Sequence, residues 1–118
     1  MILKISLLLV LLLIAYMSLT PTVSISIGND KVGHLLAYTA LMTNLGLLTL
    51  KRKFLFRLGI GCSFIYGVLM EIGQCFVPGR TFSKYDILAN AGGVIIGLIF
   101  TILFGSSILR LLKAVRII

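Results

Sequence analysis

Apolar residues form four long stretches in this chain, and short polar segments separate them. The stretches cover about residues 3–20, 30–50, 54–77 and 83–105. Each has a length in or near the range of roughly 17–25 residues with which an α-helix crosses the hydrocarbon core of a bilayer. The pattern therefore predicts an all-α membrane protein built as a bundle of four transmembrane helices.

Residues 106–118 follow the last stretch and have a different pattern. Arg110, Lys113 and Arg116 are set among Ile, Leu and Val residues. Basic residues spaced through an apolar segment are typical of a helix that lies in the membrane interface. We therefore expect a short interfacial C-terminal helix after the fourth span.

The first stretch has the length of either a secretory signal peptide or a membrane span. It follows Lys4, consists almost entirely of Leu and Ile, and ends before Pro21. Bulky Tyr16 and Met17 stand where a cleavage site needs small residues. We therefore favour a helix that is retained in the membrane.

Small residues recur at every fourth position in the third and fourth predicted helices, a spacing that lets helices approach closely in a membrane. In the third helix this row consists of Gly59, Ser63 and Gly67, and its next member is Glu71. The row should therefore direct Glu71 into the bundle and away from lipid. The row of the fourth helix consists of Ala89, Gly93, Gly97, Thr101 and Gly105.

Composition agrees with a membrane protein of one domain. Among 118 residues, 59% are hydrophobic and 12% are charged, against about 25% charged residues in soluble domains. The net charge of +8 suggests a nucleic-acid partner at first. However, the basic residues lie at the ends of the apolar stretches, where they act as topology signals. We therefore expect the lipid bilayer, and no nucleic acid, as the partner.

The basic residues also predict an orientation in the cell membrane. Lys4, the segment 51–57 and the tail carry eight Lys and Arg residues and no acidic residue. The other side carries only Lys31, Arg80 and Lys84 among the basic residues. Because cytoplasmic loops are enriched in Lys and Arg, we expect both termini in the cytoplasm. The three acidic residues and the only histidine then lie at the outer face.

Three of the predicted helices bring polar side chains to the same depth at this outer face. A carboxylate in an apolar stretch is costly unless it is paired or hydrated, which makes it a functional candidate. Glu71, His34 and Asp86 form a hypothetical acid/base cluster. Arg80, in a Pro-Gly-Arg turn, suits bidentate binding of phosphate. The further candidates for substrate contacts are Lys84, Lys31, Asp30, Tyr38, Gln74 and Asn90.

Each of these residues also has a purely structural interpretation. Asp30 can cap a helix and pair with Lys31, and His34 or Tyr38 can simply belong to the membrane interface. Glu71 can form a structural ion pair, and Asp86 can cap its helix or bind an arginine. Buried amides, here Gln74 and Asn90, commonly form hydrogen bonds between helices.

Metal and cofactor chemistry finds little support in the sequence. A metal site formed by His34, Glu71 and Asp86 lacks any ligand-spacing motif such as HExxH, so we predict none. No cofactor fingerprint, nucleophile elbow or Gly-rich phosphate loop is present. Cys62 and Cys75 are thirteen positions apart on one predicted helix, roughly 20 Å, which is too far for a disulfide.

Two segments resemble the VanZ-like family of small bacterial integral membrane proteins. They are DKVGHLLAY at residues 30–38 and EIGQCFVPGRTFSKYDILANAGG at residues 71–93. The shared pattern is Asp-Lys…His…Tyr, then Glu-x-x-Gln, a Pro-x-Arg turn and Asp…Asn…Gly. The resemblance implies that residues 1–118 form a single VanZ-like transmembrane domain. The founding member of this family is associated with resistance to the glycopeptide teicoplanin, whereas many relatives have no link to antibiotics, and the resemblance names no reaction.

Two hypotheses of function follow. In the first, the outward polar cluster binds or modifies an anionic lipid-linked or cell-envelope substrate. In the second, the protein is a non-enzymatic membrane scaffold or partner protein, and the cluster only holds its helices together. A proton or ion pathway is a weaker hypothesis, because the cytoplasmic halves of the spans lack polar residues.

Overall fold

The computed structural model describes residues 1–20, 30–79 and 84–116, which form four helices. The helices are α1 (Ile2–Leu19), α2 (Asp30–Thr49), α3 (Lys53–Gln74) and α4 (Lys84–Ala114). All four are long and apolar enough to cross a membrane, and the described residues contain no strand. The prediction of an all-α protein with four transmembrane helices is confirmed.

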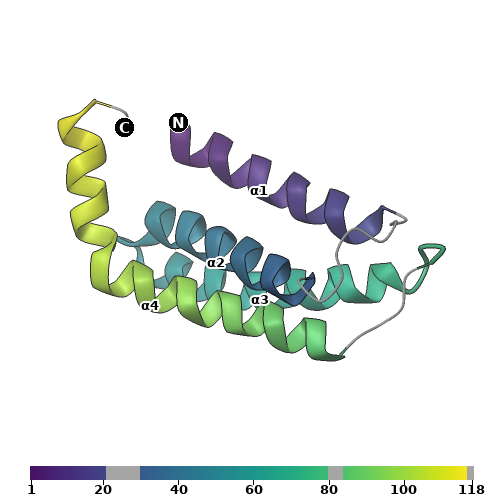
Figure 1. Cartoon of the computed structure of the whole chain (residues 1–118). Coiled ribbons are helices and arrows are strands. Elements are labelled where there is room, and N and C mark those ends of the chain that lie inside the picture. Colours follow the sequence, from purple (N-terminus) through teal and green to yellow (C-terminus); the bar gives the residue numbers. More distant parts are fainter. Residues whose placement is uncertain (21–29, 80–83, 117–118) are drawn as a thin grey trace.

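Successive helices run in opposite directions, so the bundle has two chemically different ends (Figure 1). The start of α1, the connection between α2 and α3, and the end of α4 lie at one end. We call this the basic end, because it carries Lys4, Lys51, Arg52, Lys53, Arg57, Arg110, Lys113 and Arg116. The opposite end is called the polar end, and its described polar residues include His34, Glu71, Gln74, Asp86 and Asn90.

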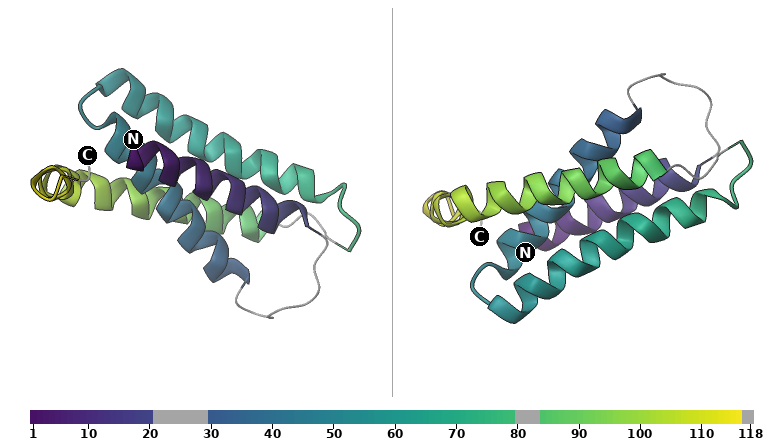
Figure 2. Two further views of the ribbon diagram at one scale, coloured as in Figure 1. Left: turned by 90° about the horizontal axis from the view of Figure 1, so that it is seen from above. Right: turned by 90° about the horizontal axis from the view of Figure 1, so that it is seen from below.

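Helices α2 and α4 cross in contact with each other's backbone (Figure 2). A Cβ atom added to Gly93 would lie 2.5 Å from the Leu35 carbonyl oxygen, and one added to Gly97 would lie 2.7 Å from the Thr39 carbonyl oxygen. Both distances are shorter than van der Waals contact. The small-residue row of α4 is therefore the surface on which α2 lies, as expected for close helix packing in membranes.

Helix α1 packs on α2 and α3, and it makes no contact with α4 within the described residues. The Tyr66 hydroxyl of α3 donates a hydrogen bond to the Leu11 carbonyl oxygen of α1 at 2.6 Å. Most of its remaining surface is apolar and exposed. The apolar core between the helices consists of Ile14, Tyr38, Leu41, Met42 and Val94.

The third helix ends three residues earlier than the sequence predicts, at Gln74 instead of Val77. Residues 75–79 form turns whose backbone bonds run from residue i+3 to residue i, beginning with Cys75 N–H to Ile72 O at 3.0 Å. The reason is Pro78, because a proline has no N–H to bond to the carbonyl four residues earlier, here that of Gln74, and its ring clashes with that carbonyl in a helix. Gly79 then has φ = +82°, a left-handed conformation that glycine adopts without strain.

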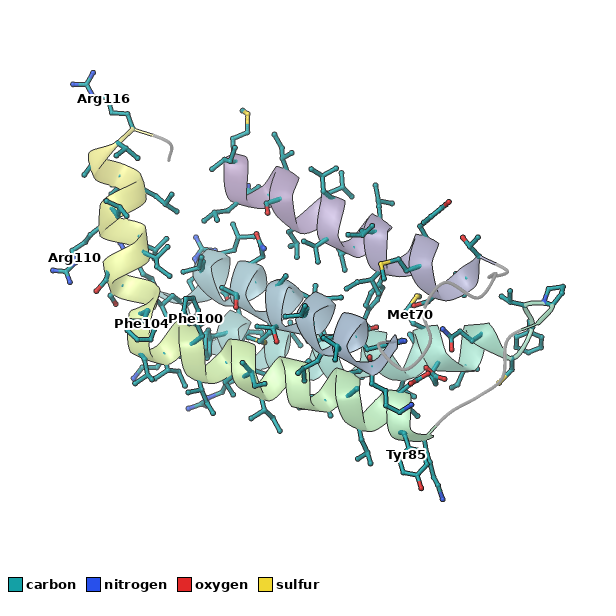
Figure 3. All side chains as sticks on the ribbon, in the orientation of Figure 1. Met70, Tyr85, Phe100, Phe104, Arg110 and Arg116 are labelled. Carbon is teal, nitrogen blue, oxygen red and sulfur yellow. The ribbon has the colours of Figure 1, made fainter. Side chains whose placement is uncertain are left out.

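The residues after 105 are helical as far as Ala114, as predicted for the tail, but they continue α4 and do not begin a new helix. Figure 1 shows that α4 bends near its C-terminal end and crosses the basic end, and Figure 3 shows Phe104 at the bend. Gly105, Ser106 and Ser107 follow directly, and Gly/Ser pairs are a known cause of kinks. The basic tail is therefore the bent continuation of the fourth span.

We expect Gly93→Ala to lower the free energy of unfolding by about 1–3 kcal/mol, the usual effect of overpacking. The added methyl group meets the Leu35 carbonyl, which is backbone and cannot rotate away. Gly61→Ala is the matched control, because nothing lies within 4 Å of its added Cβ. Unfolding by SDS in mixed micelles, followed by circular dichroism, measures both. Equal losses in the two variants would contradict the close α2–α4 contact.

Candidate functional site

The small-residue row of α3 faces the interior of the bundle over its whole length. Its members Gly59, Ser63, Gly67 and Glu71 are buried, and so is Gln74. Glu71 and Gln74 are each only 1% exposed. The prediction that this row carries Glu71 away from lipid is confirmed.

Asn90 of α4 connects three helices at the polar end. Its Oδ1 lies 2.8 Å from His34 Nδ1 of α2, and its Nδ2 donates to the Gly67 carbonyl oxygen of α3 at 3.4 Å. Because the amide NH₂ is directed to a carbonyl, the amide oxygen must accept a hydrogen bond from the imidazole N–H. Neutral His34 therefore carries its hydrogen on Nδ1.

This arrangement turns the other imidazole nitrogen toward a carboxylate. His34 Nε2 lies 3.9 Å from Asp86 Oδ2, and the two side chains are only 11% and 9% exposed. Lys31 Nζ lies 3.9 Å from Asp86 Oδ1, but its side chain is 57% exposed. Exposed ion pairs contribute little to stability. The His34–Asp86 pair is therefore the part of the site that is shielded from solvent, and Lys31 lies at the exposed boundary of the site, toward the membrane surface.

Glu71 lies at the same depth as Asp86. It is one helical turn beyond Gly67 on α3, and Asp86 is one turn before Asn90 on the antiparallel α4. Both carboxylates are thus about 6 Å nearer the polar end than the Asn90–Gly67 contact, at 1.5 Å rise per residue. Asp86 is 6% exposed. Two buried carboxylates from facing helices therefore share one level of the bundle.

Tyr38 lies beside this level and carries a buried hydroxyl group. Its residue is 1% exposed, its ring centroid is 6.4 Å from that of Tyr66, and its phenol lies within electrostatic range of Glu71. Among the described residues, neither the Tyr38 hydroxyl nor Gln74 Nε2 has a hydrogen-bond partner. An unpaired buried donor costs about 1–3 kcal/mol, so these two atoms are natural contacts for a polar ligand.

Helix α1 contributes to the site, which the sequence reasoning did not anticipate. A cavity of about 20 Å³ lies between α1 and α2, enough for about one water molecule. The buried hydroxyl-bearing residue Ser18 is 4% exposed. The only sequence signal for it is a small hydroxyl residue in the last turn of a helix that is otherwise almost all apolar. The cavity is lined by Ile14, Met17, Ser18, Gly33, His34, Ala37 and Tyr38.

A second cavity, of about 30 Å³, lies between α3 and α4 on the other side of the network and is lined in part by Ser63, Gly67 and Asn90. Ligand pockets usually measure about 300–1,000 Å³. Neither cavity can therefore hold a substrate head group in this conformation. A head group has to meet the cluster from the polar end, where Lys31 is exposed.

Among the described residues, the predicted site residue Lys84 is not brought into this network. Arg80 and the side chain of Asp30 lie outside the described residues. Lys84 is exposed at the start of α4, with its Nζ 5.9 Å from the centroid of the Tyr85 ring. Within the described parts of the chain, no group of three His, Cys, Asp or Glu residues is arranged to hold a metal ion.

The family model described as VanZ/LLP1 matches residues 3–105 of the chain. The match includes all of α1 except Ile2, α2 and α3 in full, and α4 as far as its bend. The comparisons with curated proteins and with solved structures give no match.

We expect Asn90→Ala to lower the free energy of unfolding by about 1–2 kcal/mol, the upper part of the range for hydrogen bonds between membrane helices. The change removes the partners of both His34 and the Gly67 carbonyl. Asn44→Ala is the control, because the Asn44 amide bonds only to Ala40 O of its own helix, at 3.0 Å. SDS-induced unfolding compares the two variants. A loss at Asn90 no larger than that at Asn44 would argue against the three-helix network.

Proposed function

This chain belongs to the VanZ/LLP1 family, and we propose that it binds or chemically modifies an anionic lipid-linked or cell-envelope substrate at its polar end. The observation that carries the proposal is the oriented imidazole. Asn90 fixes His34 by a hydrogen bond of 2.8 Å, and Asp86 lies 3.9 Å from the opposite ring nitrogen. A histidine held from one side and directed at a carboxylate on the other is suited to transferring a proton.

In the proposed mechanism, His34 Nε2 accepts a proton from a polar group of the substrate and later returns it, and the Asp86 carboxylate, 3.9 Å from that nitrogen, stabilises the imidazolium formed in between. Glu71, at the same depth, serves as the second acid or base. The Tyr38 hydroxyl and the Gln74 amide donate hydrogen bonds to the substrate, since both are buried without a partner among the described residues.

Basic residues at the polar end would recognise the anionic part of the substrate. Lys31 is exposed and already pairs with Asp86, so an incoming phosphate can compete for its ammonium group. Lys84 is exposed at the start of α4. Arg80, in the connection between α3 and α4, would add a bidentate guanidinium contact.

The charge asymmetry supports an outer position for this site. Eight Lys and Arg residues belong to the basic end, and three belong to the polar end, and for this distribution the positive-inside rule predicts both termini in the cytoplasm. The polar end then faces the outer leaflet of the cell membrane, where lipid-linked envelope precursors are accessible. This location agrees with a role in glycopeptide (teicoplanin-type) resistance.

The alternative function is a non-enzymatic scaffold or partner protein. Asn90 favours it, because both of its hydrogen bonds end on neighbouring helices. Buried amides of this kind stabilise helix association in membranes. The two functions make different predictions for variants of Glu71.

We expect Glu71→Gln to abolish the effect of the protein in cells while leaving the fold intact, since the side chain keeps its size and loses only its charge. If Glu71 is a general acid or base, the loss in rate is about 100-fold or more. The measurement is the envelope-lipid profile and the teicoplanin sensitivity of a bacterial strain that depends on this chain. Gly61→Ala, at equal protein level, is the control. Unchanged profiles and sensitivity in the Glu71 variant would refute the catalytic role.

A double variant, Glu71→Met with Gln74→Leu, separates the site from the scaffold. Well-packed apolar residues of similar volume often replace buried polar groups without loss of stability. A scaffold therefore keeps both its stability and its cellular effect in this variant. A substrate site keeps the stability and loses the effect.

Orientation is tested with a thiol that the chain already contains. Cys75 is exposed just beyond the end of α3 at the polar end, and Cys62 is exposed in the middle of that helix. We expect a membrane-impermeant maleimide to label Cys75 in intact cells, because the polar end faces outward. Cys75→Ser should remove the labelling, whereas Cys62→Ser should not. Labelling that requires permeabilised cells would show the opposite orientation.

A further inference from the structure

The bend of α4 creates a groove at the basic end that the proposed function does not use. The groove has a volume of about 290 Å³ and is lined by Phe100, Phe104, Ser107, Ile108 and Leu111. The two phenylalanines lie at the bend (Figure 3), with ring centroids 5.2 Å apart. Ser107, Ile108 and Leu111 follow the bend in sequence. The groove therefore runs from the transmembrane part of α4 onto the basic tail.

A guanidinium group lies at the rim of this groove. Arg110 Nη2 donates to Ser107 Oγ at 3.4 Å, and Ser107 itself lines the groove. Arg110 is exposed on the part of α4 beyond the bend (Figure 3). The guanidinium has five N–H donors, so the contact with Ser107 leaves others for a phosphate group, which arginine binds in bidentate geometry.

The electrostatic surroundings favour an anion at this position. Lys4, the segment 51–57 and the tail place eight Lys and Arg residues at the basic end, and all three acidic residues of the chain belong to the polar end. Lys and Arg residues close to a membrane surface attract anionic lipid head groups, and their contributions accumulate. A zwitterionic head group gains no such attraction.

The order of chemical groups along the groove matches a phospholipid in the adjacent leaflet. Its aromatic part belongs to the span, where acyl chains surround the protein, and its polar rim belongs to the bent tail, at the level of the head groups. We propose that the groove binds an anionic phospholipid, with an acyl chain against Phe100 and Phe104 and its phosphate at Arg110 and Ser107. This lipid site does not depend on the chemistry proposed for the polar end.

The chain contains no tryptophan, so Phe104→Trp introduces a single tryptophan, whose emission is read separately from that of the tyrosines, into the groove. Phe104 is 50% exposed, which leaves room for the larger ring. The full-length variant is reconstituted in phosphatidylcholine vesicles. One series contains a small fraction of brominated phosphatidylglycerol, and a second series contains the same fraction of brominated phosphatidylcholine. We expect the brominated phosphatidylglycerol to reach half-maximal quenching at about a fivefold lower mole fraction, the effect of roughly one phosphate–arginine attraction near a membrane surface.

Two arginine substitutions in this background test the head-group contact. Arg110→Gln should abolish the preference for phosphatidylglycerol. Arg116→Gln removes the same charge from the same tail but leaves the contact of Arg110 with the groove residue Ser107 in place, so the preference should remain. Equal effects of the two substitutions would overturn the site and leave only a general attraction of the tail for anionic lipid.

A second reporter tests the position of the site. Phe54→Trp places the fluorophore on an exposed residue of the same end, 75% exposed and beside Lys53, so it reports the general enrichment of anionic lipid. The preference at position 104 should exceed that at position 54. Equal preferences would overturn the proposal. Phe100→Trp provides a second groove reporter and is expected to give the same result as Phe104→Trp.

Discussion

A polar side chain inside a bilayer has no water to bind and must find its partners within the protein. In this chain the need is met by bringing backbones close together. Asn90 reaches the Gly67 carbonyl only because position 67 has no side chain, since an added Cβ would lie 3.2 Å from both Asn90 Cβ and Tyr38 Cε1. Gly93 has the same role between α4 and α2. The polar contacts therefore depend on the glycine rows, which let the helices approach closely enough for these contacts to form.

The same close packing of the helices gives His34 its orientation. With Asn90 held between two helices, the ring of His34 has one nitrogen fixed and the other turned to Asp86. A loosely packed bundle could contain the same residues without this geometry. Stability and chemistry thus depend on the same contacts, which is why variants that keep the packing but change the charge, such as those at Glu71, are informative.

The two ends of the bundle differ in whether their ionisable side chains are buried or exposed. The polar end buries the carboxylates of Glu71 and Asp86 and most of the His34 imidazole between helices, so these groups are shielded and oriented. The basic end exposes its Lys and Arg residues, where they meet water and lipid head groups. Helix α1 is held through Tyr66 and adds a wall next to His34. A ligand that approaches His34 from the side covered by α1 would have to move that helix. At the polar end, next to the exposed Lys31, the site is already accessible.

The sequence by itself determined the four helices, the charge asymmetry and the burial of Glu71, because these follow from the length of apolar stretches, the position of Lys and Arg, and the four-residue spacing of small side chains. It placed the end of α3 three residues too late, since the effect of Pro78 begins before the proline itself. Only the tertiary structure decided that Asn90 meets His34 and Gly67, that Ser18 joins the site, and that the tail continues α4 around a bend. A periodic pattern identifies the face that a helix buries, but which helix covers that face, and at what height, depends on how all four helices pack together.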